Sequence, residues 1–374
     1  MLYLGIDGGG TKTEAILCDE NGHILRRVLA GASAPSSIPE EDLRQTMKGL
    51  LDALSLDPQT PVTAFAGISG CIKAWDRGMF RKAVLPILPA NISLTLDGDG
   101  TCGLNAAFGP HGDGLLLIVG TGSTALMRRN GQFSEIGGWG YLLGDEGSGY
   151  DMGRRAINTA LKALDGRGRP TILTRTLPEK VGVPMDEITN QMYFNGRRGI
   201  ASCAGALIEA AMAGDEPAME QFTAAVAELR LHIRTARRKA PGLRLAVAGG
   251  LPAHYPLLWE RITEGFEDME PLLLTMPPVY GAVLAALGCV PEGLEKRFMD
   301  EYTQCLQEET RRVSDAANDK MESGEALPER SDRECDDKEE TRRVSDAAND
   351  KMESGEALPE RSDRECDDKE EKAK

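Results

Sequence analysis

Hydrophobic residues over positions 1–306 alternate between short apolar runs and stretches with helical spacing. The apolar runs predict strands over 3–6, 15–18, 62–68, 92–96, 115–119 and 243–247. Helical spacing predicts helices over 40–54, 77–88 and 200–240, the last broken near 214–217. Strands that alternate with helices in this way are typical of an α/β protein.

Two of the predicted strands end in a glycine turn and are followed directly by another apolar run. Glycine lacks the Cβ atom that would keep a phosphate away from backbone N–H groups, and hydroxyl and ammonium groups add donors. Because a strand rather than a helix follows each turn, neither is a dinucleotide or P-loop motif. The predicted phosphate-binding residues are Gly8, Gly9, Gly10, Thr11, Lys12 and Thr13, and then Gly120, Thr121, Gly122 and Ser123.

Three carboxylates lie close to predicted strand ends. Asp7 precedes the first glycine turn, where it would repel phosphate unless Mg²⁺ lay between them, so we expect it to be the metal-side residue. Asp97 follows the strand over 92–96, and we expect it to act as a general base toward a substrate hydroxyl. Asp99 is its rival, and capping of a helix is the alternative role for either acid.

The glycine-rich segment 137–153 contains acids and one aromatic residue. Its glycines would let the backbone approach a polyhydroxylated ligand, while Asp145 and Glu146 could accept hydrogen bonds from hydroxyl groups. The alternatives are that Trp139 is a core aromatic residue and that one of the acids caps a helix beginning near Tyr150.

Composition narrows the class of protein. The 374 residues, 41% of them hydrophobic, are enough for two globular domains. A net charge of −16 argues against nucleic acid as a partner, and no apolar run is long enough to span a membrane. The start of the chain lacks a targeting segment, so we expect a cytoplasmic protein. The eight cysteines show no CxxC spacing, which indicates reduced thiols.

The C-terminal residues contain a tandem duplication. Residues 310–340 recur unchanged at 341–371. Each copy has six basic and eleven acidic residues, so the two copies carry −10 of the net charge of −16. Large apolar residues are too few for a stacked core, and we expect a disordered or transiently helical acidic tail over 308–374.

Three motifs together resemble the BadF/BadG/BcrA/BcrD-type ATPase family, and within it the N-acetylglucosamine kinases: GIDGGGTKT at 5–13, IVGTGS at 118–123 and GGWGYLLGDEGSGYDMG at 137–153. The likeness covers about residues 1–290 and implies two ribonuclease-H-like domains of the actin, Hsp70 and sugar-kinase superfold, with ATP and sugar in the cleft between them. The implied domains are 1–105, completed by a helix over 292–307, and 106–291.

The resemblance also implies roles for single residues. It favours Asp97 over Asp99 as the base and places Gly249 and Gly250 at the adenosine of ATP, with Mg²⁺ as the metal. The residues expected on the sugar side are Ser69, Asp97, Thr121, Gly137, Gly138, Trp139, Asp145 and Glu146. Sugar and ATP are the expected small-molecule partners, and a homodimer is left open.

The implied reaction is ATP-dependent phosphorylation of the 6-hydroxyl of an amino sugar, first of all N-acetylglucosamine. Pro35 stands where sugar kinases of the family usually have a sugar-binding asparagine, so Ser33 or Ser36 would have to substitute. Glucosamine and N-acetylmuramic acid therefore stay open as substrates. Two functions of another class are an ATPase activator of a dehydratase, which would need cluster-binding cysteines, and a sugar sensor without turnover.

Overall fold

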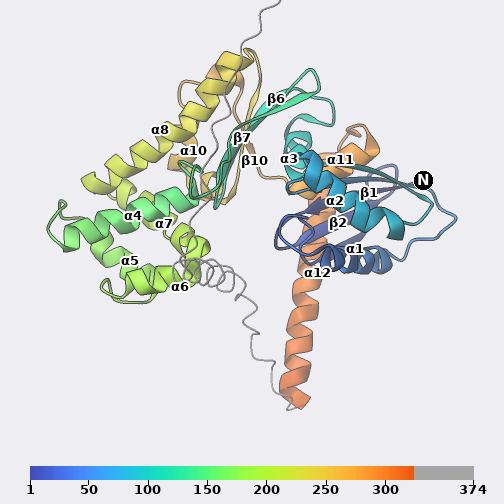
Figure 1. Cartoon of the computed structure of the whole chain (residues 1–374), viewed down its shortest axis with the longest axis horizontal. Coiled ribbons are helices and arrows are strands. Elements are labelled where there is room, and N and C mark those ends of the chain that lie inside the picture. The colour runs from blue at the N-terminus through green and yellow to red at the C-terminus, as the bar shows by residue number, and fades with distance from the viewer. Residues whose placement is uncertain (324–374) are drawn as a thin grey trace, which may run out of the picture. The chain divides into compact units, whose positions relative to one another are not determined.

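The structure, a computed structural model, describes the backbone of residues 1–323 and the side chains of residues 1–311. Two five-stranded sheets flanked by helices form a mixed α/β architecture (Figure 1). The first sheet and its helices comprise β1 (Leu2–Gly8), β2 (Thr13–Cys18), β3 (Ile24–Ala30), α1 (Glu40–Leu54), β4 (Val62–Ile68), α2 (Ala74–Val84), β5 (Ile92–Gly98) and α3 (Asp99–Phe108).

The remaining helices lie between and after the strands of the second sheet in the sequence. Its strands are β6 (Gly114–Val119), β7 (Ser123–Arg129), β8 (Gln132–Gly137), β9 (Leu245–Ala248) and β10 (Leu272–Leu274). The helices are α4 (Gly149–Leu164), α5 (Leu173–Val181), α6 (Ile188–Ser202), α7 (Ala204–Met212), α8 (Glu216–Lys239), α9 (Gly250–His254), α10 (Pro256–Thr263), α11 (Pro278–Leu287) and α12 (Leu294–Ser323).

The two sheets repeat one topology. The first has the order β3-β2-β1-β4-β5, with β1 antiparallel to β2 and parallel to β4. The second has the order β10-β9-β6-β7-β8, with β6 antiparallel to β7 and parallel to β9. In each sheet the central strand therefore turns directly into its antiparallel neighbour, and these are the two hairpins that carry the glycine turns.

The central strand of the second sheet, β6, is buried on both faces. Leu115, Leu117 and Val119 of β6 pack into a core that includes Phe222 of α8. Leu116, between them, packs instead into a core that includes residues of α3 and α11. Because successive side chains of a strand point to opposite faces, a continuous apolar run is what such a strand requires.

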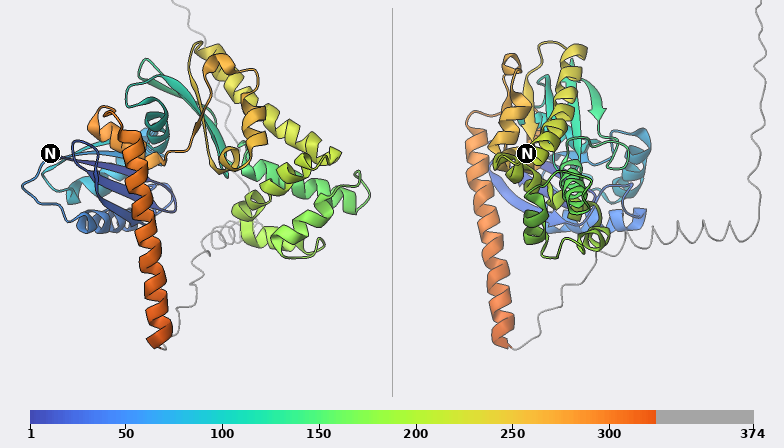
Figure 2. Two further views of the ribbon diagram at one scale, coloured as in Figure 1. Left: turned by 180° about the vertical axis from the view of Figure 1, so that it is seen from behind. Right: turned by 90° about the vertical axis from the view of Figure 1, so that its left-hand side faces the viewer.

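Helices α3 and α11 form a layer between the two sheets (Figure 1; Figure 2). Glycine residues allow the backbones of β1, α11 and α3 to pack closely against one another. A Cβ atom on Gly5 of β1 would lie 2.5 Å from the backbone nitrogen of Val283, and one on Gly281 of α11 would lie 1.8 Å from the carbonyl oxygen of Cys102. Neither position has room for a side chain.

Most of the predicted elements are present, with shifted ends. The helix expected over 77–88 begins earlier, as α2, and its last residues form a 3₁₀ turn at Leu85–Ile87. The long helical region 200–240 is divided into the end of α6, then α7 and α8, and the break near 214–217 is the start of α8. The strands β8 and β10 are additions to the predicted elements: β8 has no distinct apolar pattern, and β10 is a run of only three leucines.

The helix expected over 292–307 is the first part of α12. Leu294 and Phe298 are fully buried, and the Tyr302 hydroxyl donates a hydrogen bond to Glu14 of β2 at 2.9 Å. Residues Met1–Leu306 form one compact unit. Helix α12 continues to Ser323, into the segment expected as a tail, and the rest of that tail lies outside the described residues.

Cys18, Cys71, Cys102 and Cys203 are buried thiols, as expected of reduced cysteines. Among the described residues, no helix combines the length and the apolar character that crossing a membrane requires.

Two truncations test how far the folded unit extends. A chain ending after Glu309 keeps every core contact described for α12, so its melting temperature should lie within about 2 °C of that of the full chain. A chain ending after Gly293 loses the burial of Leu294 and Phe298 and should lose about 3–6 kcal/mol of stability. Thermal unfolding of both chains checks this. A lower melting temperature for the Glu309 chain would contradict it.

Candidate functional site

The strand register brings the first group of predicted residues to one edge of the first sheet. Asp7 of β1 pairs with Gly67 of β4, which pairs with Asp97 of β5. The three strands are parallel, so the glycine turn after β1, Ser69 after β4 and the start of α3 after β5 all follow at this edge. The Ser69 N–H donates to the carbonyl of Gly8 at 2.8 Å.

The first glycine turn is held by its own backbone and by the loop after β3. The N–H of Gly9 donates to the carbonyl of Lys12 at 2.9 Å, and the carbonyl of Gly9 accepts from Ser33 at 3.0 Å. A Cβ atom on Gly8 would lie 2.2 Å from the Ser33 hydroxyl oxygen, so glycine is required by packing. Gly10, Thr11 and Lys12 are exposed at the tip and are available to a ligand.

Thr13 occupies a different position from the rest of this group. Its side chain is fully buried, and its hydroxyl donates to the carbonyl of Gly31 at 2.7 Å and lies 2.8 Å from the Ser33 hydroxyl. We therefore assign Thr13 to the support of the hairpin and leave it out of the proposed phosphate contacts. Ser33, which was considered as a replacement for the missing asparagine, is buried in the same contact.

Three hydrogen bonds hold the Asp97 carboxylate. One oxygen, Oδ1, accepts from Arg77 Nη2 at 3.0 Å and from the Gly98 N–H at 2.9 Å, and Oδ2 accepts from the Thr101 hydroxyl at 3.1 Å. Because a carboxylate has about four acceptor positions, roughly one is left for a substrate hydroxyl. The side chain is 27% exposed, so a ligand can reach it.

Burial affects the pKa values of the other two carboxylates at this edge, Asp7 and Asp99. Burial raises the pKa of Asp99, and hydrogen bonds from Ser69 and the Gly100 N–H offset part of the rise. Burial, followed by the negative charges of Asp99 and Glu14, raises the pKa of Asp7 to about 7, although Lys12 acts in the opposite direction. Within the described residues no hydrogen bond to the Asp7 carboxylate is found.

These surroundings fit a magnesium-side role for Asp7. A desolvated carboxylate with acidic neighbours and no donor is stabilised by a nearby cation. In the part of the chain that the structure describes, no three His, Cys, Asp or Glu side chains come together as a metal site. Mg²⁺ needs no such cluster, because with nucleotides it takes most of its ligands from phosphate and water.

The second glycine turn packs against the start of α4. The N–H groups of Gly149 and Tyr150 donate to the carbonyls of Gly120 and Thr121 at 2.8 and 3.1 Å. The buried Ser123 hydroxyl donates to the carbonyl of Glu146 at 2.8 Å. The turn is thereby fixed to the loop that contains Asp145 and Glu146.

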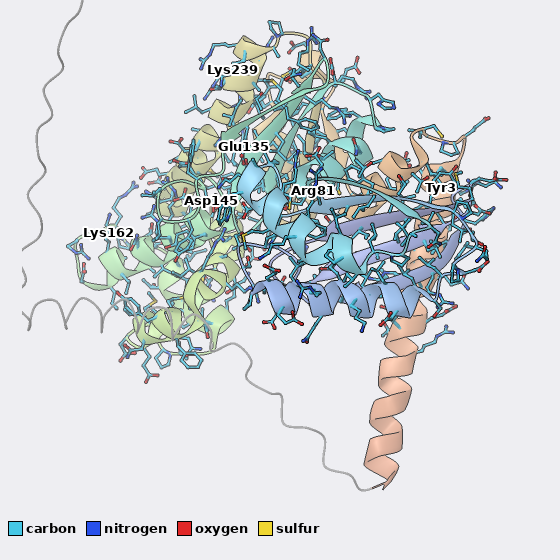
Figure 3. The ribbon with its side chains drawn as sticks, turned by 45° about the vertical axis from the view of Figure 1, so that its right-hand side comes forward. Tyr3, Arg81, Glu135, Asp145, Lys162 and Lys239 are labelled. Atoms are coloured by element: carbon cyan, nitrogen blue, oxygen red, sulfur yellow. The ribbon has the colours of Figure 1, made fainter. Side chains whose placement is uncertain are left out.

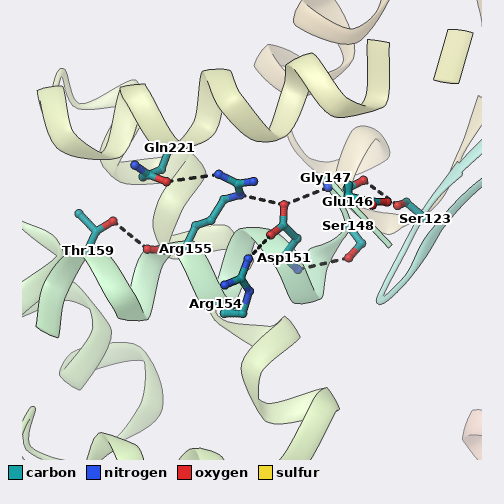
Figure 4. Close-up of polar contacts among 9 residues, drawn as sticks. All are labelled: Ser123, Glu146, Gly147, Ser148, Asp151, Arg154, Arg155, Thr159 and Gln221. Carbon is teal, nitrogen blue, oxygen red and sulfur yellow. Dashed lines mark hydrogen bonds and ion pairs between the residues drawn. The ribbon is translucent and has the colours of Figure 1, made fainter. Parts of the chain in front are cut away.

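An ionic network stabilises that loop from behind (Figure 4). Asp151 of α4 accepts hydrogen bonds from the Gly147 N–H at 3.0 Å, from Arg155 at 2.8 Å and from Arg154 at 3.0 Å. Burial alone would raise the pKa of Asp151, but the hydrogen bonds from Arg155, Gly147 and Arg154 outweigh it and lower this pKa below its usual value. The carboxylate thus acts structurally, as an anchor for residues 147–155.

Asp145 lies in the loop ahead of α4 (Figure 3). The residue is 4% exposed, its backbone is left-handed with φ +57°, and its Oδ2 accepts from Arg197 Nη2 of α6 at 2.9 Å. A Cβ atom on Gly122 would lie 2.7 Å from that oxygen. Asp145 is therefore in contact with the second glycine turn.

The remaining predicted residues surround this second group at different depths. Trp139 is 78% exposed, so the alternative hypothesis that it is a core aromatic residue is wrong. A Cβ atom on Gly138 would lie 2.7 Å from the Thr124 hydroxyl, and one on Gly137 would lie 2.2 Å from Nε2 of His232. A Cβ atom on Gly249 would lie 2.0 Å from the Val119 carbonyl oxygen, which places the expected adenosine turn, with Gly250, beside the second hairpin.

Two arginines that the sequence did not indicate hold the two central acids. Arg77 of α2 pairs with Asp97, and Arg197 of α6 pairs with Asp145. In the sequence each is one arginine on a polar helix, and such a residue usually faces solvent. Only the proximity of a candidate acid distinguishes them, and that proximity is a property of the fold.

A family model described as the BadF/BadG/BcrA/BcrD ATPase family matches residues 4–287. The chain belongs to this family. Both hairpins, Asp97, Asp145 and the turn at Gly249 lie within the matched residues.

Proteins similar to this chain are named as amino sugar kinases. The chain is 29% identical over 314 residues to the N-acetyl-D-glucosamine kinase of Dictyostelium discoideum, covering 76% of this chain and 98% of that protein. It is 26% identical to the N-acetylmuramic acid/N-acetylglucosamine kinase of Clostridium acetobutylicum, covering 76% and 97%. A crystal structure of a candidate N-acetylglucosamine kinase from Chromobacterium violaceum is similar with a TM-score of 0.61 and 29% identity, covering 76% of this chain and 98% of that one.

The raised pKa of Asp7 predicts a pH-dependent cost to stability. Between its ordinary value of 3.8 and about 7, the unfolded chain releases the Asp7 proton while the folded chain retains it, so stability falls as pH rises. Asp7→Asn removes this loss. Without Mg²⁺, the free energy of unfolding of the variant should rise relative to that of the natural protein between pH 4 and 7. At pH 8 the variant should be more stable by up to about 4 kcal/mol.

Unfolding by denaturant at pH 5 and pH 8 with a chelator present measures the effect. Asp186→Asn is the matched control, because Asp186 is exposed on the surface. An Asp7→Asn variant that is less stable than the natural protein at pH 8 would mean that the carboxylate makes favourable contacts in the ligand-free state.

Proposed function

We propose that the chain is an ATP-dependent kinase that transfers the γ-phosphoryl group of ATP to the 6-hydroxyl of an amino sugar, with N-acetylglucosamine as the first substrate to test. In this proposal the two sheets are the centres of two ribonuclease-H-like domains, 1–105 with the helix over 292–307 and 106–291. ATP and sugar bind in the cleft between them.

The duplicated hairpin carries the proposal. Each sheet has one hairpin between its central strand and its antiparallel neighbour, and each hairpin turns through glycine and hydroxyl residues. Backbone N–H groups at such turns form concavities that bind anions. Two of them, on two sheets of the same topology, suit a polyphosphate held from two sides. The similar proteins from Dictyostelium discoideum and Clostridium acetobutylicum are named as kinases, which supports ATP as that ligand.

The phosphate contacts are assigned to the glycine turns of both hairpins. In the first turn Gly10, Thr11 and Lys12 are exposed and would offer a backbone N–H group, a hydroxyl and a positive charge, while Gly8 and Gly9 shape the turn. In the second turn Thr121 is the exposed residue, beside Gly120 and Gly122, and Ser123 fixes the turn from its buried side. Mg²⁺ bound with ATP would neutralise charge on the phosphates, and Asp7 is the residue that would hold it. Gly249 and Gly250 would lie against the adenosine.

The chemical step is assigned to Asp97. Its remaining acceptor position would receive the proton of the 6-hydroxyl while the hydroxyl oxygen forms a bond to the γ-phosphorus. The bond between that phosphorus and the bridging oxygen of ADP breaks, and ADP leaves. Ser69, Thr121, Gly137, Gly138, Trp139, Asp145 and Glu146 would orient the sugar.

The choice of sugar depends on the loop after β3. Pro35, at the position expected for a sugar-binding asparagine, is buried and has no side-chain donor. Ser36 is exposed, and its hydroxyl oxygen would lie 3.5 Å from a Cβ atom on Gly70. We assign Ser36 rather than Ser33 as the residue that replaces the missing amide.

One assay separates this function from its alternatives. Purified protein is incubated with ATP, Mg²⁺ and, in turn, N-acetylglucosamine, glucosamine and N-acetylmuramic acid, and ADP and phosphosugar are measured. Sugar-dependent ADP release with phosphorylation at the 6-hydroxyl is the expected result. Sugar-independent hydrolysis would favour an ATPase activator, and sugar binding without turnover would favour a sensor.

Replacement of the base gives the second test. Asp97→Asn keeps the size of the side chain but removes its ability to accept a proton, so turnover should fall by about two to four orders of magnitude while ATP still binds. Asp99→Asn is the matched control and should lower turnover much less. Near-normal turnover in Asp97→Asn together with a large loss in Asp99→Asn would exchange the two roles.

Pro35→Asn tests the assignment of the sugar loop. The new amide would add a hydrogen bond of about 1 kcal/mol and should lower the Michaelis constant for N-acetylglucosamine several-fold without changing that for ATP. Ser36→Ala should raise the same constant. If neither substitution alters the constants for the sugars, the loop does not contact the sugar.

A further inference from the structure

The pair Asp145–Arg197 joins three segments that are far apart in the sequence. Asp145 lies in the loop before α4, Arg197 lies in α6, and the missing side chain of Gly122 makes room for both. A Cβ atom on Gly122 would lie 2.7 Å from Asp145 Oδ2 and 2.8 Å from Arg197 Nη2. A side chain at position 122 would therefore displace one of the two partners of the ion pair.

Helix α6 is interrupted directly before Arg197. Gly196, with φ +57° and ψ −149°, interrupts α6, and Arg197 begins the helical segment after the break. These dihedral angles are disfavoured for residues with a side chain. The break changes the direction of the helix at the residue before the one that pairs with Asp145.

An aromatic side chain also contacts the Arg197 guanidinium group. The Cζ atom of Arg197 lies 5.3 Å from the centre of the Tyr141 ring, a cation–π contact. Tyr141 in turn packs edge-on against Tyr150 with ring centres 5.1 Å apart. Since the Tyr150 N–H donates to the carbonyl of Thr121, the two tyrosines also connect the ion pair to the second glycine turn.

The two partners differ in their access to solvent. The side chain of Asp145 is 6% exposed and that of Arg197 is 40% exposed. A buried carboxylate requires a compensating charge, and here the guanidinium provides it through one oxygen, Oδ2. The second oxygen, Oδ1, is left as the acceptor for a ligand, with its direction fixed by the ion pair.

We propose that Arg197 is a positioning residue for sugar recognition, which acts by fixing the Asp145 carboxylate so that Oδ1 accepts a hydroxyl of the substrate. The inference rests on the proposed function. It assigns to Arg197 an effect on sugar affinity through Asp145, and no effect on the transfer step at Asp97.

Kinetics of single substitutions test the assignment. Arg197→Met should raise the Michaelis constant for N-acetylglucosamine by about tenfold to a hundredfold, because the carboxylate loses its charged partner. The turnover number and the Michaelis constant for ATP should change by less than about threefold. Arg197→Lys should recover part of the sugar affinity, because a single ammonium can still pair with Oδ2.

Arg175→Met is the matched control. Arg175 pairs with Glu179 on α5, and both side chains are largely exposed. Its removal should leave all three constants unchanged. A general loss of stability after Arg197→Met would instead alter turnover and ATP affinity as well, and that result would overturn a positioning role. If Arg197→Met does not fold, Arg197→Gln is expected to show the same selective rise.

A double-mutant cycle distinguishes action through Asp145 from direct contact with the sugar. Asp145→Asn weakens sugar binding by itself, and adding Arg197→Met to it should change sugar affinity by less than about twofold. Effects that multiply would overturn the inference. So would a much larger loss for N-acetylmuramic acid than for N-acetylglucosamine, since it would show that the guanidinium binds the carboxylate of the sugar.

A binding measurement separates failure of this inference from failure of the proposed function. The rise in melting temperature with added N-acetylglucosamine reports sugar binding without turnover. No rise and no sugar phosphorylation in the natural protein would refute the proposed function. Normal phosphorylation in the natural protein, with an unchanged sugar constant in Arg197→Met, would refute the role of Arg197 alone.

Discussion

The central layer of α3 and α11 depends on close backbone packing, and the rest of the molecule depends on that layer. Gly5 lets β1 approach α11, and Gly281 lets α11 approach α3. On its other side α3 packs onto the second sheet through Gly100 and Gly103, where added Cβ atoms would lie 2.1 and 2.5 Å from leucine side chains. Since glycine in a helix costs about 1 kcal/mol relative to alanine, this packing must compensate for a weaker helix. It also fixes the junction between β5 and α3, where Asp97 and Asp99 lie.

The two sheets share one topology, but their acidic residues lie in different places. The central strand of the first sheet has Asp7 directly before its last residue, and the acids Asp97 and Asp99 lie near it. The corresponding strand of the second sheet ends in Val119, and its acid, Asp145, comes from a later loop. Negative charge that would be costly beside phosphate is thus gathered on one sheet, where a cation could balance it. The second turn instead meets backbone groups and a carboxylate already paired with Arg197.

The sequence predicted the class of fold and the two hairpins because both have local causes. An apolar run predicts a buried strand, and glycine at its end predicts close approach of backbone or ligand. The burial of Thr13 was not predicted, since it depends on the loop after β3 packing over the hairpin. The pairs Asp97–Arg77 and Asp145–Arg197 were also missed, because their members are 20 and 52 residues apart in sequence and only the fold joins them.

The paired arginines suit the two candidate carboxylates to the different tasks proposed for them. Asp97 has donors on both oxygens, so it is held in one orientation with about one acceptor position left, which suits the role of base proposed for it. Asp145 has one donor on one oxygen and is more deeply buried, which leaves a whole oxygen for recognition of a hydroxyl. A carboxylate that transfers a proton needs a fixed direction toward one atom. A carboxylate that selects a ligand needs an open acceptor whose desolvation is already compensated, and Arg197 supplies that compensation.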